Sequence, residues 1–91
     1  MISKDTIDKV FEFSRVEEVI SDFIALKKSG ANYKGLSPFT IEKTPSFVVS
    51  PSKQIWKDFS SGKGGNVIAF LMEHEQFNYP ESIRYLANKY N

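Results

Sequence analysis

The sequence predicts an α+β domain in which helices flank a small antiparallel β-sheet. Three observations lead to this fold class. Apolar residues recur at three- and four-residue spacing near both ends of the 91-residue chain, as is typical of amphipathic helices. Two short runs of β-branched and aromatic residues in the middle are joined by the turn signal Ser50-Pro51-Ser52-Lys53. A glycine-rich stretch then separates the predicted sheet from the last helices.

Length and composition allow one small domain over residues 1–91, with a modest core. Hydrophobic residues make up 41% of the chain, and cysteine is absent. The absence of cysteine excludes disulfides and thiolate metal ligands, and no apolar run approaches the ~20 residues that cross a bilayer. The first residues lack the basic and then apolar order of a signal peptide, so we expect a cytoplasmic location and no membrane partner.

The N-terminal segment is predicted to form two helices that act as scaffold. Over residues 4–13 the apolar face consists of Ile7, Val10 and Phe11. Ser3 can cap this helix. The run Ser14-Arg15-Val16-Glu17 matches a capping box, which predicts that a second helix starts at Ser14. Its buried stripe is expected to consist of Val16, Val19, Ile20 and Phe23.

Four strands are predicted between residues 24 and 59. Residues 24–28 and 32–36 form a first pair around Ser29-Gly30, and residues 46–50 and 54–59 form a hairpin. Strand alternation places Trp56 on the face opposite Ile55 and Phe59. The side chains expected in the core are Phe39, Phe47 and Phe59. Trp56 is compatible with either the core or an exposed face.

Two further helices are predicted after the glycine-rich stretch. Asn66 should cap a helix over residues 67–75, and Pro80 should be the first residue of a last helix that ends near Lys89. His74, the only histidine, is expected to be a surface or half-buried helix residue rather than a ligand or base. Residues 62–65 lack the spacing of nucleotide-binding glycine motifs. They can hold an anion at the following helix N-terminus or simply form a tight turn.

The net charge of +1 conceals a basic central segment. Acidic residues outnumber basic ones over residues 1–26, whereas residues 27–63 hold seven of the twelve basic residues against Glu42 and Asp58. Such a cluster is typical of a surface that binds a polyanion, although a solvated lysine-rich sheet face would give the same pattern. No acid–base pair or metal cluster can be named, so we expect no catalytic residues in this chain.

Several runs of residues resemble a known family. They are Asn32-Tyr33-Lys34-Gly35-Leu36-Ser37-Pro38-Phe39-Thr40, Glu42-Lys43-Thr44-Pro45-Ser46-Phe47, and Gly62 to Asn66 with Phe70-Leu71-Met72. They are similar to the N-terminal zinc-binding (zinc-ribbon) domain of bacterial DnaG-type DNA primases. The resemblance covers essentially the whole chain and implies a zinc-ribbon-like sheet. It also implies that residues 1–91 are the N-terminal fragment of a longer primase whose polymerase domain, absent here, synthesises the RNA primer in DNA replication.

The four positions at which this family carries zinc ligands hold no thiolate or imidazole here. The C-x-x-H…C-x-x-C spacing falls on Ser37, Thr40, Asp58 and Ser61. Hydroxyls bind zinc poorly, and one carboxylate cannot replace the missing ligands, so we predict a metal-free domain without cofactor; a hard cation at Asp58 is the alternative. A structural zinc contributes on the order of 10 kcal/mol to folding. We predict that a hydrogen-bond cluster replaces it, with Asp58 accepting from the hydroxyls or from backbone amides.

The resemblance implies binding of single-stranded DNA template at initiation sites. Single strands are bound by lysines along the backbone and by aromatic rings that stack on bases. The candidates of these two kinds are Tyr33, Lys34, Lys43, Lys53, Trp56, Lys57 and Lys63. The alternative function is a protein-interaction module of the primosome that docks on the primase polymerase domain or the replicative helicase and binds little DNA.

Overall fold

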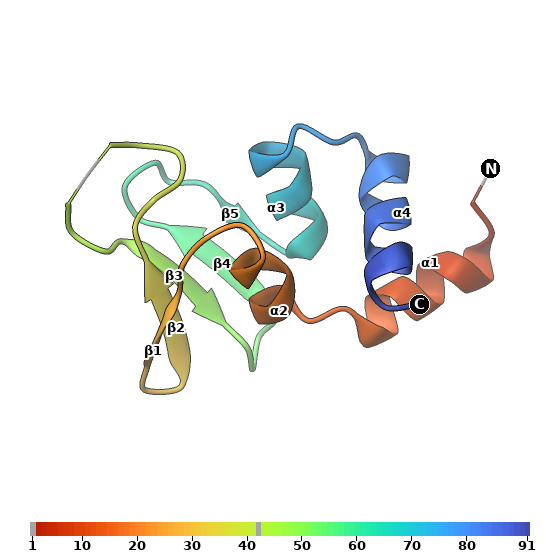
Figure 1. Ribbon diagram of the computed structural model, residues 1–91, viewed down its shortest axis with the longest axis horizontal. Helices are drawn as coiled ribbons and strands as arrows, with labels where there is room; N and C mark the ends of the chain where they lie inside the picture. Colours follow the sequence, from red (N-terminus) through yellow and green to blue (C-terminus); the bar gives the residue numbers. More distant parts are fainter. Residues whose placement is uncertain (1, 42) are drawn as a thin grey trace.

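A five-stranded antiparallel sheet lies at one end of the molecule and a pair of helices, α1 and α4, at the other (Figure 1). The computed structural model describes residues 2–41 and 43–91; Met1 and Glu42, the latter part of the Glu-Lys-Thr-Pro-Ser-Phe run, lie outside the described residues. The elements in chain order are α1 (Lys4–Phe13), α2 (Val16–Ser21), β1 (Lys27–Ser29), β2 (Asn32–Gly35), β3 (Phe47–Ser50), β4 (Ile55–Asp58), β5 (Gly64–Gly65), α3 (Val67–His74) and α4 (Tyr79–Lys89).

Three helices begin at side-chain caps that satisfy free backbone N–H groups. Ser3 and Asn66 each accept a hydrogen bond from the amide three residues ahead, at the start of α1 and α3. Both caps were predicted and are confirmed. Asn78 forms a capping box with Glu81 at the start of α4, so Pro80 is the second helical residue rather than the predicted first.

The predicted capping box at the start of α2 is wrong. The helix begins at Val16, and the Ser14 hydroxyl is buried with no hydrogen-bond partner among the described residues. A residue from the β3–β4 turn caps the helix instead: Gln54 Oε1 accepts from the Val16 amide at 2.9 Å, and Gln54 Nε2 donates to Glu17 Oε1 at 3.0 Å. A tertiary contact has therefore replaced the local cap.

The sheet has the strand order β1-β2-β3-β4-β5, and each neighbouring pair is antiparallel. The two predicted hairpins are confirmed. β1 starts at Lys27, three residues later than predicted, because residues 24–26 cross over Gly35, where the Ala25 carbonyl oxygen lies 2.7 Å from the place a Cβ would take. β5 was not predicted, since glycine has a low strand propensity.

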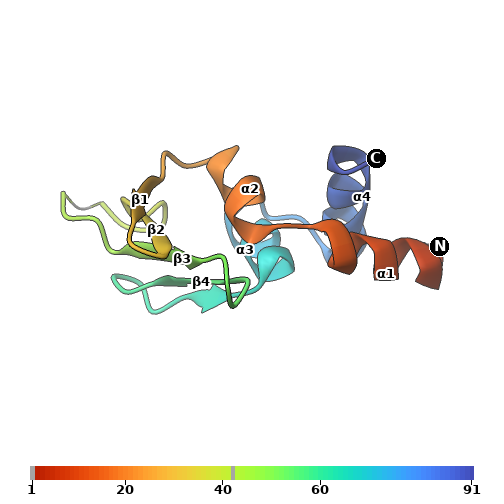
Figure 2. The ribbon, with the colours of Figure 1, turned by 90° about the horizontal axis from the view of Figure 1, so that it is seen from below.

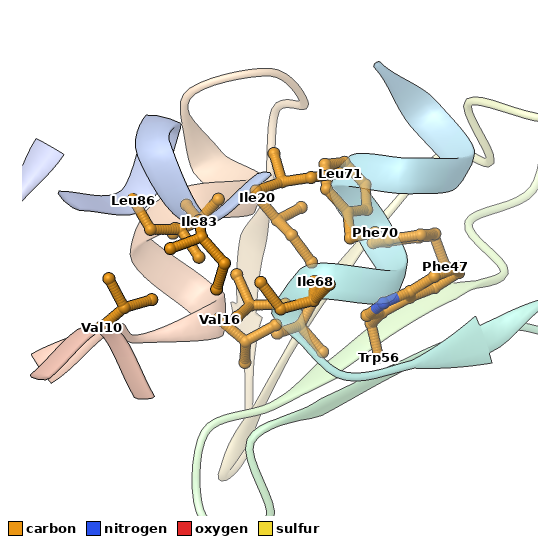
Figure 3. Close-up of a cluster of buried hydrophobic side chains, with 13 residues drawn as sticks. Val10, Val16, Ile20, Phe47, Trp56, Ile68, Phe70, Leu71, Ile83 and Leu86 are labelled. Atoms are coloured by element: carbon orange, nitrogen blue, oxygen red, sulfur yellow. The ribbon is translucent and has the colours of Figure 1, made fainter. Parts of the chain in front are cut away.

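α2 and α3 lie between the sheet and the α1–α4 pair (Figure 2). One apolar cluster runs through all three layers. It extends from Val10 and Leu86 at the helical end to Phe47 and Trp56 beneath the sheet (Figure 3). We call the buried face of the sheet, which includes Trp56, the inner face, and the opposite one the outer face. No helix among the described residues is long and apolar enough to cross a membrane.

The structure decides between the two interpretations of Trp56. Its side chain is 1% exposed, packs against Phe47 with ring centroids 5.5 Å apart, and donates its indole N–H to the Asn66 carbonyl oxygen at 2.8 Å. Trp56 therefore belongs to the core. The prediction that Phe59 is also a core residue is wrong, because Phe59 is 67% exposed. Phe47 is fully buried, as predicted, whereas Phe39, also expected in the core, is only half-buried and packs against it.

Candidate nucleic-acid interface and knuckle cluster

Cross-strand pairing places three lysines in one row on the outer face of the sheet. Lys27 lies opposite Lys34, Lys34 opposite Val48, and Val48 opposite Lys57. Residues directly opposite each other in neighbouring strands point to the same face. The outer row, which we define as Lys27, Lys34, Val48 and Lys57, therefore spans four strands and carries a positive charge on three of them, and its three lysines are exposed.

Apolar side chains border the outer row. Ile55 and Phe59 lie two residues before and two residues after Lys57, and they are 43% and 67% exposed. Ile55, Phe59, Lys53 and Val48 line a shallow depression on this face. Phe59 and Lys27 were not among the predicted DNA-binding residues. The two-residue spacing from Lys57 is the sequence signal that could have placed Phe59 on the lysine face.

Five of the seven predicted DNA-binding residues lie at one or the other face of the sheet. Those at the outer face are Lys34, Lys53 and Lys57. Tyr33 and Trp56 belong to the opposite row, in which Val49 pairs with both. Tyr33 is half-buried, with the Lys28 ammonium 5.6 Å from its ring centroid, and the buried Trp56 offers no surface on which a base could stack.

The other two predicted lysines lie in loops. The Lys63 ammonium is 2.9 Å from the Glu73 carboxylate and 5.7 Å from the centroid of the Phe39 ring, so part of its charge is neutralised within the chain. Lys43 is exposed in the segment before β3. The glycine-rich stretch forms β5 and leads directly into α3, which accounts for its composition as a tight strand-to-helix connection.

His74 is a half-buried residue of α3, as predicted. Its ring stacks on Phe70 with centroids 5.0 Å apart, and its Nδ1 lies 3.0 Å from Glu75 Oε2. The histidine is therefore part of the aromatic packing around α3.

Residues from the segments 37–40 and 58–61, which we call the first and second knuckle, come together around one carboxylate. Ser37 and Ser61 donate hydrogen bonds to Asp58 Oδ2 at 2.7 and 2.6 Å. Ser60 donates to Asp58 Oδ1 at 3.1 Å, and its Oγ lies 2.7 Å from Thr40 Oγ1. Because Ser60 directs its hydrogen at Asp58, Thr40 is the donor in the last contact. The predicted hydrogen-bond cluster is confirmed, and Ser60 is a member that sequence analysis missed.

The same residues order the backbone of both knuckles. In the first, Ser37 Oγ accepts from the amides of Phe39 and Thr40 at 3.1 and 3.2 Å. In the second, the Gly62 amide donates to the Asp58 carbonyl oxygen at 2.8 Å. Gly62 has a φ of 81°, in the left-handed region that favours glycine. Each knuckle is thus a turn linked to Asp58, the first through the Ser37 side chain and the second through the Gly62 backbone amide.

Asp58 is fully buried, with 0% exposure. Burial by itself raises the pKa of the Asp58 carboxyl, but the hydrogen bonds donated by Ser61, Ser37 and Ser60 outweigh burial and hold the pKa below its usual value. The carboxylate is therefore ionised at neutral pH and acts as the common acceptor of the cluster.

The residues at the four family ligand positions do not fit a zinc ion. Zinc sites in proteins use thiolates, imidazoles and carboxylates, and these positions supply one carboxylate that already accepts three hydroxyl hydrogens. Across residues 2–41 and 43–91, no three His, Cys, Asp or Glu side chains gather where they could hold a metal ion. No metal chemistry is assigned to this site.

Comparisons with known proteins agree with the resemblance. The CHC2 zinc finger family model matches residues 2–91. The DNA primase of Clostridium acetobutylicum is 46% identical over 91 residues, which is 100% of this chain, and that of Listeria monocytogenes is 48% identical over 87 residues, or 96% of it. The matches cover 15% and 14% of those two primases, so the chain spans a small part of the length of these relatives.

A solved structure shares the fold. The crystal structure of the Aquifex aeolicus primase, with its zinc-binding and RNA polymerase domains, matches with a TM-score of 0.87 and 42% sequence identity. The match covers 99% of this chain and 22% of that one.

Proposed function

The chain belongs to the CHC2 zinc-finger family of DNA primases, and on that basis we propose that the outer face of its sheet binds single-stranded DNA template. In this proposal the domain recognises initiation sites, in the cytoplasm, for RNA primer synthesis. The family model takes up residues 2–91, so these 91 residues contain no polymerase domain. The chain supplies recognition, and a separate polymerase domain supplies catalysis.

The observation that carries the proposal is the outer row together with Phe59. Lysines that follow a phosphate backbone, beside an aromatic side chain that stacks on bases, are the combination used by proteins that bind single strands. Lys34 and Lys57 lie in one row across the sheet, and Phe59 is exposed on the same face as Lys57. Phe59 takes the stacking role that sequence analysis gave to Trp56.

The pairing of Lys27 with Lys34 supports the same proposal. Like charges directly opposite each other in neighbouring strands destabilise a sheet, and this pair lies in register at the sheet edge. A bound phosphate between the two ammonium groups would remove the repulsion. The arrangement therefore favours an anionic ligand that spans β1 and β2.

The test is fluorescence anisotropy of short, labelled single-stranded DNA across a salt series. We expect Lys57→Ala and Lys34→Ala to weaken binding and each to reduce the slope of log affinity against log salt by about 1. Phe59→Ala should cost about 1–3 kcal/mol of binding free energy at any salt concentration, because stacking is lost. Lys4→Ala, on α1 at the far end of the molecule, is the matched control.

Two results would count against template binding. One is the absence of detectable binding at low salt. The other is an equal loss of affinity in Lys4→Ala and Lys57→Ala, which would point to non-specific attraction by total charge rather than to the outer face.

A second candidate function is docking on the polymerase domain of the primase or on the replicative helicase. The observation that favours it is the pair of exposed aromatic side chains on α1, Phe11 at 47% and Phe13 at 57%. Phe13 borders a groove between α1 and α4 that Val10 and Leu86 also line. Sedimentation of the chain with each partner separates the candidates, because Phe13→Ser should weaken docking and leave DNA binding unchanged.

A further inference from the structure

We propose that this domain folds without a metal ion, because the Asp58-centred hydrogen-bond cluster joins the two knuckles as zinc does in the family's zinc fingers. The inference concerns folding and does not depend on DNA binding. It follows from what the cluster connects, from the direction of its hydrogen bonds and from the surroundings of the buried carboxylate.

The cluster connects the same two segments that a zinc ion at the family ligand positions would connect. The Ser37–Asp58 bond joins residues 21 apart in the chain, and the Thr40–Ser60 bond joins residues 20 apart. Both bonds measure 2.7 Å and run from the first knuckle to the second. The two cross-links close the segment that contains β3 and β4.

The hydrogen bonds point the wrong way for a cation. Ser37 directs its hydrogen at Asp58, and its oxygen accepts from the backbone amides of the first knuckle. Ser61 does the same in the second knuckle, where its oxygen accepts from the Lys63 amide at 3.3 Å. A metal ion requires lone pairs that converge on one point. Here the hydroxyl hydrogens converge on the carboxylate instead, so a hard cation fits the cluster as poorly as zinc does.

The carboxylate is stabilised by neutral donors rather than by a positive charge. Asp58 is fully buried, and within the described residues no ammonium or guanidinium group forms an ion pair with it. A buried charge of this kind persists only where several hydrogen bonds converge on it, as those from Ser37, Ser60 and Ser61 do.

Aromatic packing connects the first knuckle to the core. Phe39 stacks on Trp56 with ring centroids 5.8 Å apart and an interplanar angle of 30°. Trp56 in turn packs edge-to-face on Phe70 of α3, at 5.7 Å. The first knuckle is therefore held by an apolar contact as well as by the cluster.

The experiment measures metal content and thermal unfolding of the 91-residue chain. The protein is purified from cells grown with added zinc, analysed by mass spectrometry for zinc and other metals, and melted with and without EDTA. We expect no stoichiometric metal and the same Tm in both buffers. The matched control is the quadruple variant Ser37→Cys, Thr40→His, Asp58→Cys and Ser61→Cys, which restores the family ligand set. It should bind about one zinc per chain, and its Tm should fall in EDTA.

Stoichiometric zinc or any other metal in the parent chain, or a parent Tm that falls in EDTA, would overturn the proposal. A second pair of variants tests the cluster itself. Ser61→Ala removes one donor to Asp58 and should lower the Tm, whereas Ser52→Ala, an exposed serine in the β3–β4 turn, should not. Equal Tm values for these two variants would show that the cluster does not hold the knuckles, even if the parent is metal-free.

Discussion

The knuckle cluster and the core beneath the sheet are neighbours, since Asp58 pairs directly with Phe47, yet different interactions hold them. In this part of the core, aromatic rings pack in stacked and edge-to-face contacts, and each side chain has many weak contacts with several others. In the cluster, three hydroxyls share one acceptor. The stability lost when a core side chain is removed therefore depends on the volume of that side chain. Removal of the single carboxylate, by contrast, breaks all three hydrogen bonds of the cluster at once.

The largest expected effect comes from the core. Phe47→Ala should lower the free energy of unfolding by about 3–5 kcal/mol, because it removes a fully buried ring between Trp56 and Phe70. Urea unfolding followed by circular dichroism measures the loss. Phe59→Ala, on the outer face, is the control and should change stability by less than about 0.5 kcal/mol. If both variants lost equal stability, the assignment of inner and outer faces would be wrong.

Asp58→Asn should have the next largest effect. An amide accepts fewer hydrogen bonds than a carboxylate and loses the charge-assisted part of each, so we expect a loss of about 2 kcal/mol in the free energy of unfolding. The same urea experiment applies. Asp8→Asn, an exposed change on α1, serves as the control. A variant as stable as the parent would mean that the hydroxyls do not depend on the charge.

Acid should destabilise the knuckles by a smaller amount. The folded-state pKa of Asp58 is lowered, so the unfolded state binds more protons and stability rises with pH through this range. The stabilisation of the fold by ionised Asp58 is fully present above the pKa of about 3.9 that an aspartate has in the unfolded chain. It is lost as the pH falls through the pKa of Asp58 in the folded state. Thermal melts between neutral pH and strong acid should show a shallower acid dependence in Asp58→Asn than in the parent; parallel curves would contradict the assignment.

The residual acid dependence of that variant should come partly from Glu17. Burial by itself raises the pKa of the Glu17 carboxyl, but hydrogen bonds from Gln54, its own backbone amide and Arg15 hold it below the usual value. Ionised Glu17 therefore stabilises the fold in the same pH direction as Asp58. It does so at the start of α2, away from the knuckles.

The smallest effects should come from the two possible caps of α2. Gln54→Ala removes the acceptor of the Val16 amide and should cost about 1 kcal/mol. Ser14→Ala removes a buried hydroxyl that has no partner among the described residues, and it should be neutral or slightly stabilising. Thermal melts of the two variants measure both. If Ser14→Ala were less stable than Gln54→Ala, the result would support the predicted local capping box at Ser14.

Sequence analysis predicted the knuckle cluster better than the face of the sheet that we propose for DNA binding. The family resemblance identified four positions that share one site, so the sequence was enough to group Ser37, Thr40, Asp58 and Ser61. Whether Trp56 is buried could not be predicted. Alternation shows only that Trp56 and Phe59 lie on opposite faces of the sheet, and it leaves open which of the two faces is buried. Ser60 was missed because it is not a ligand position in the family pattern.

Local features of the chain by themselves determined α1, the caps at Ser3 and Asn66 and the two hairpins, because turn residues, caps and periodicity act over a few neighbours. Contacts between distant segments decided the rest. Gln54 displaced Ser14 as the cap of α2, the backbone at Ala25 shortened β1 by crossing Gly35, and α3 covered the face that holds Trp56. Which side of a sheet is buried depends on where the helices pack, and that is a property of the assembled core.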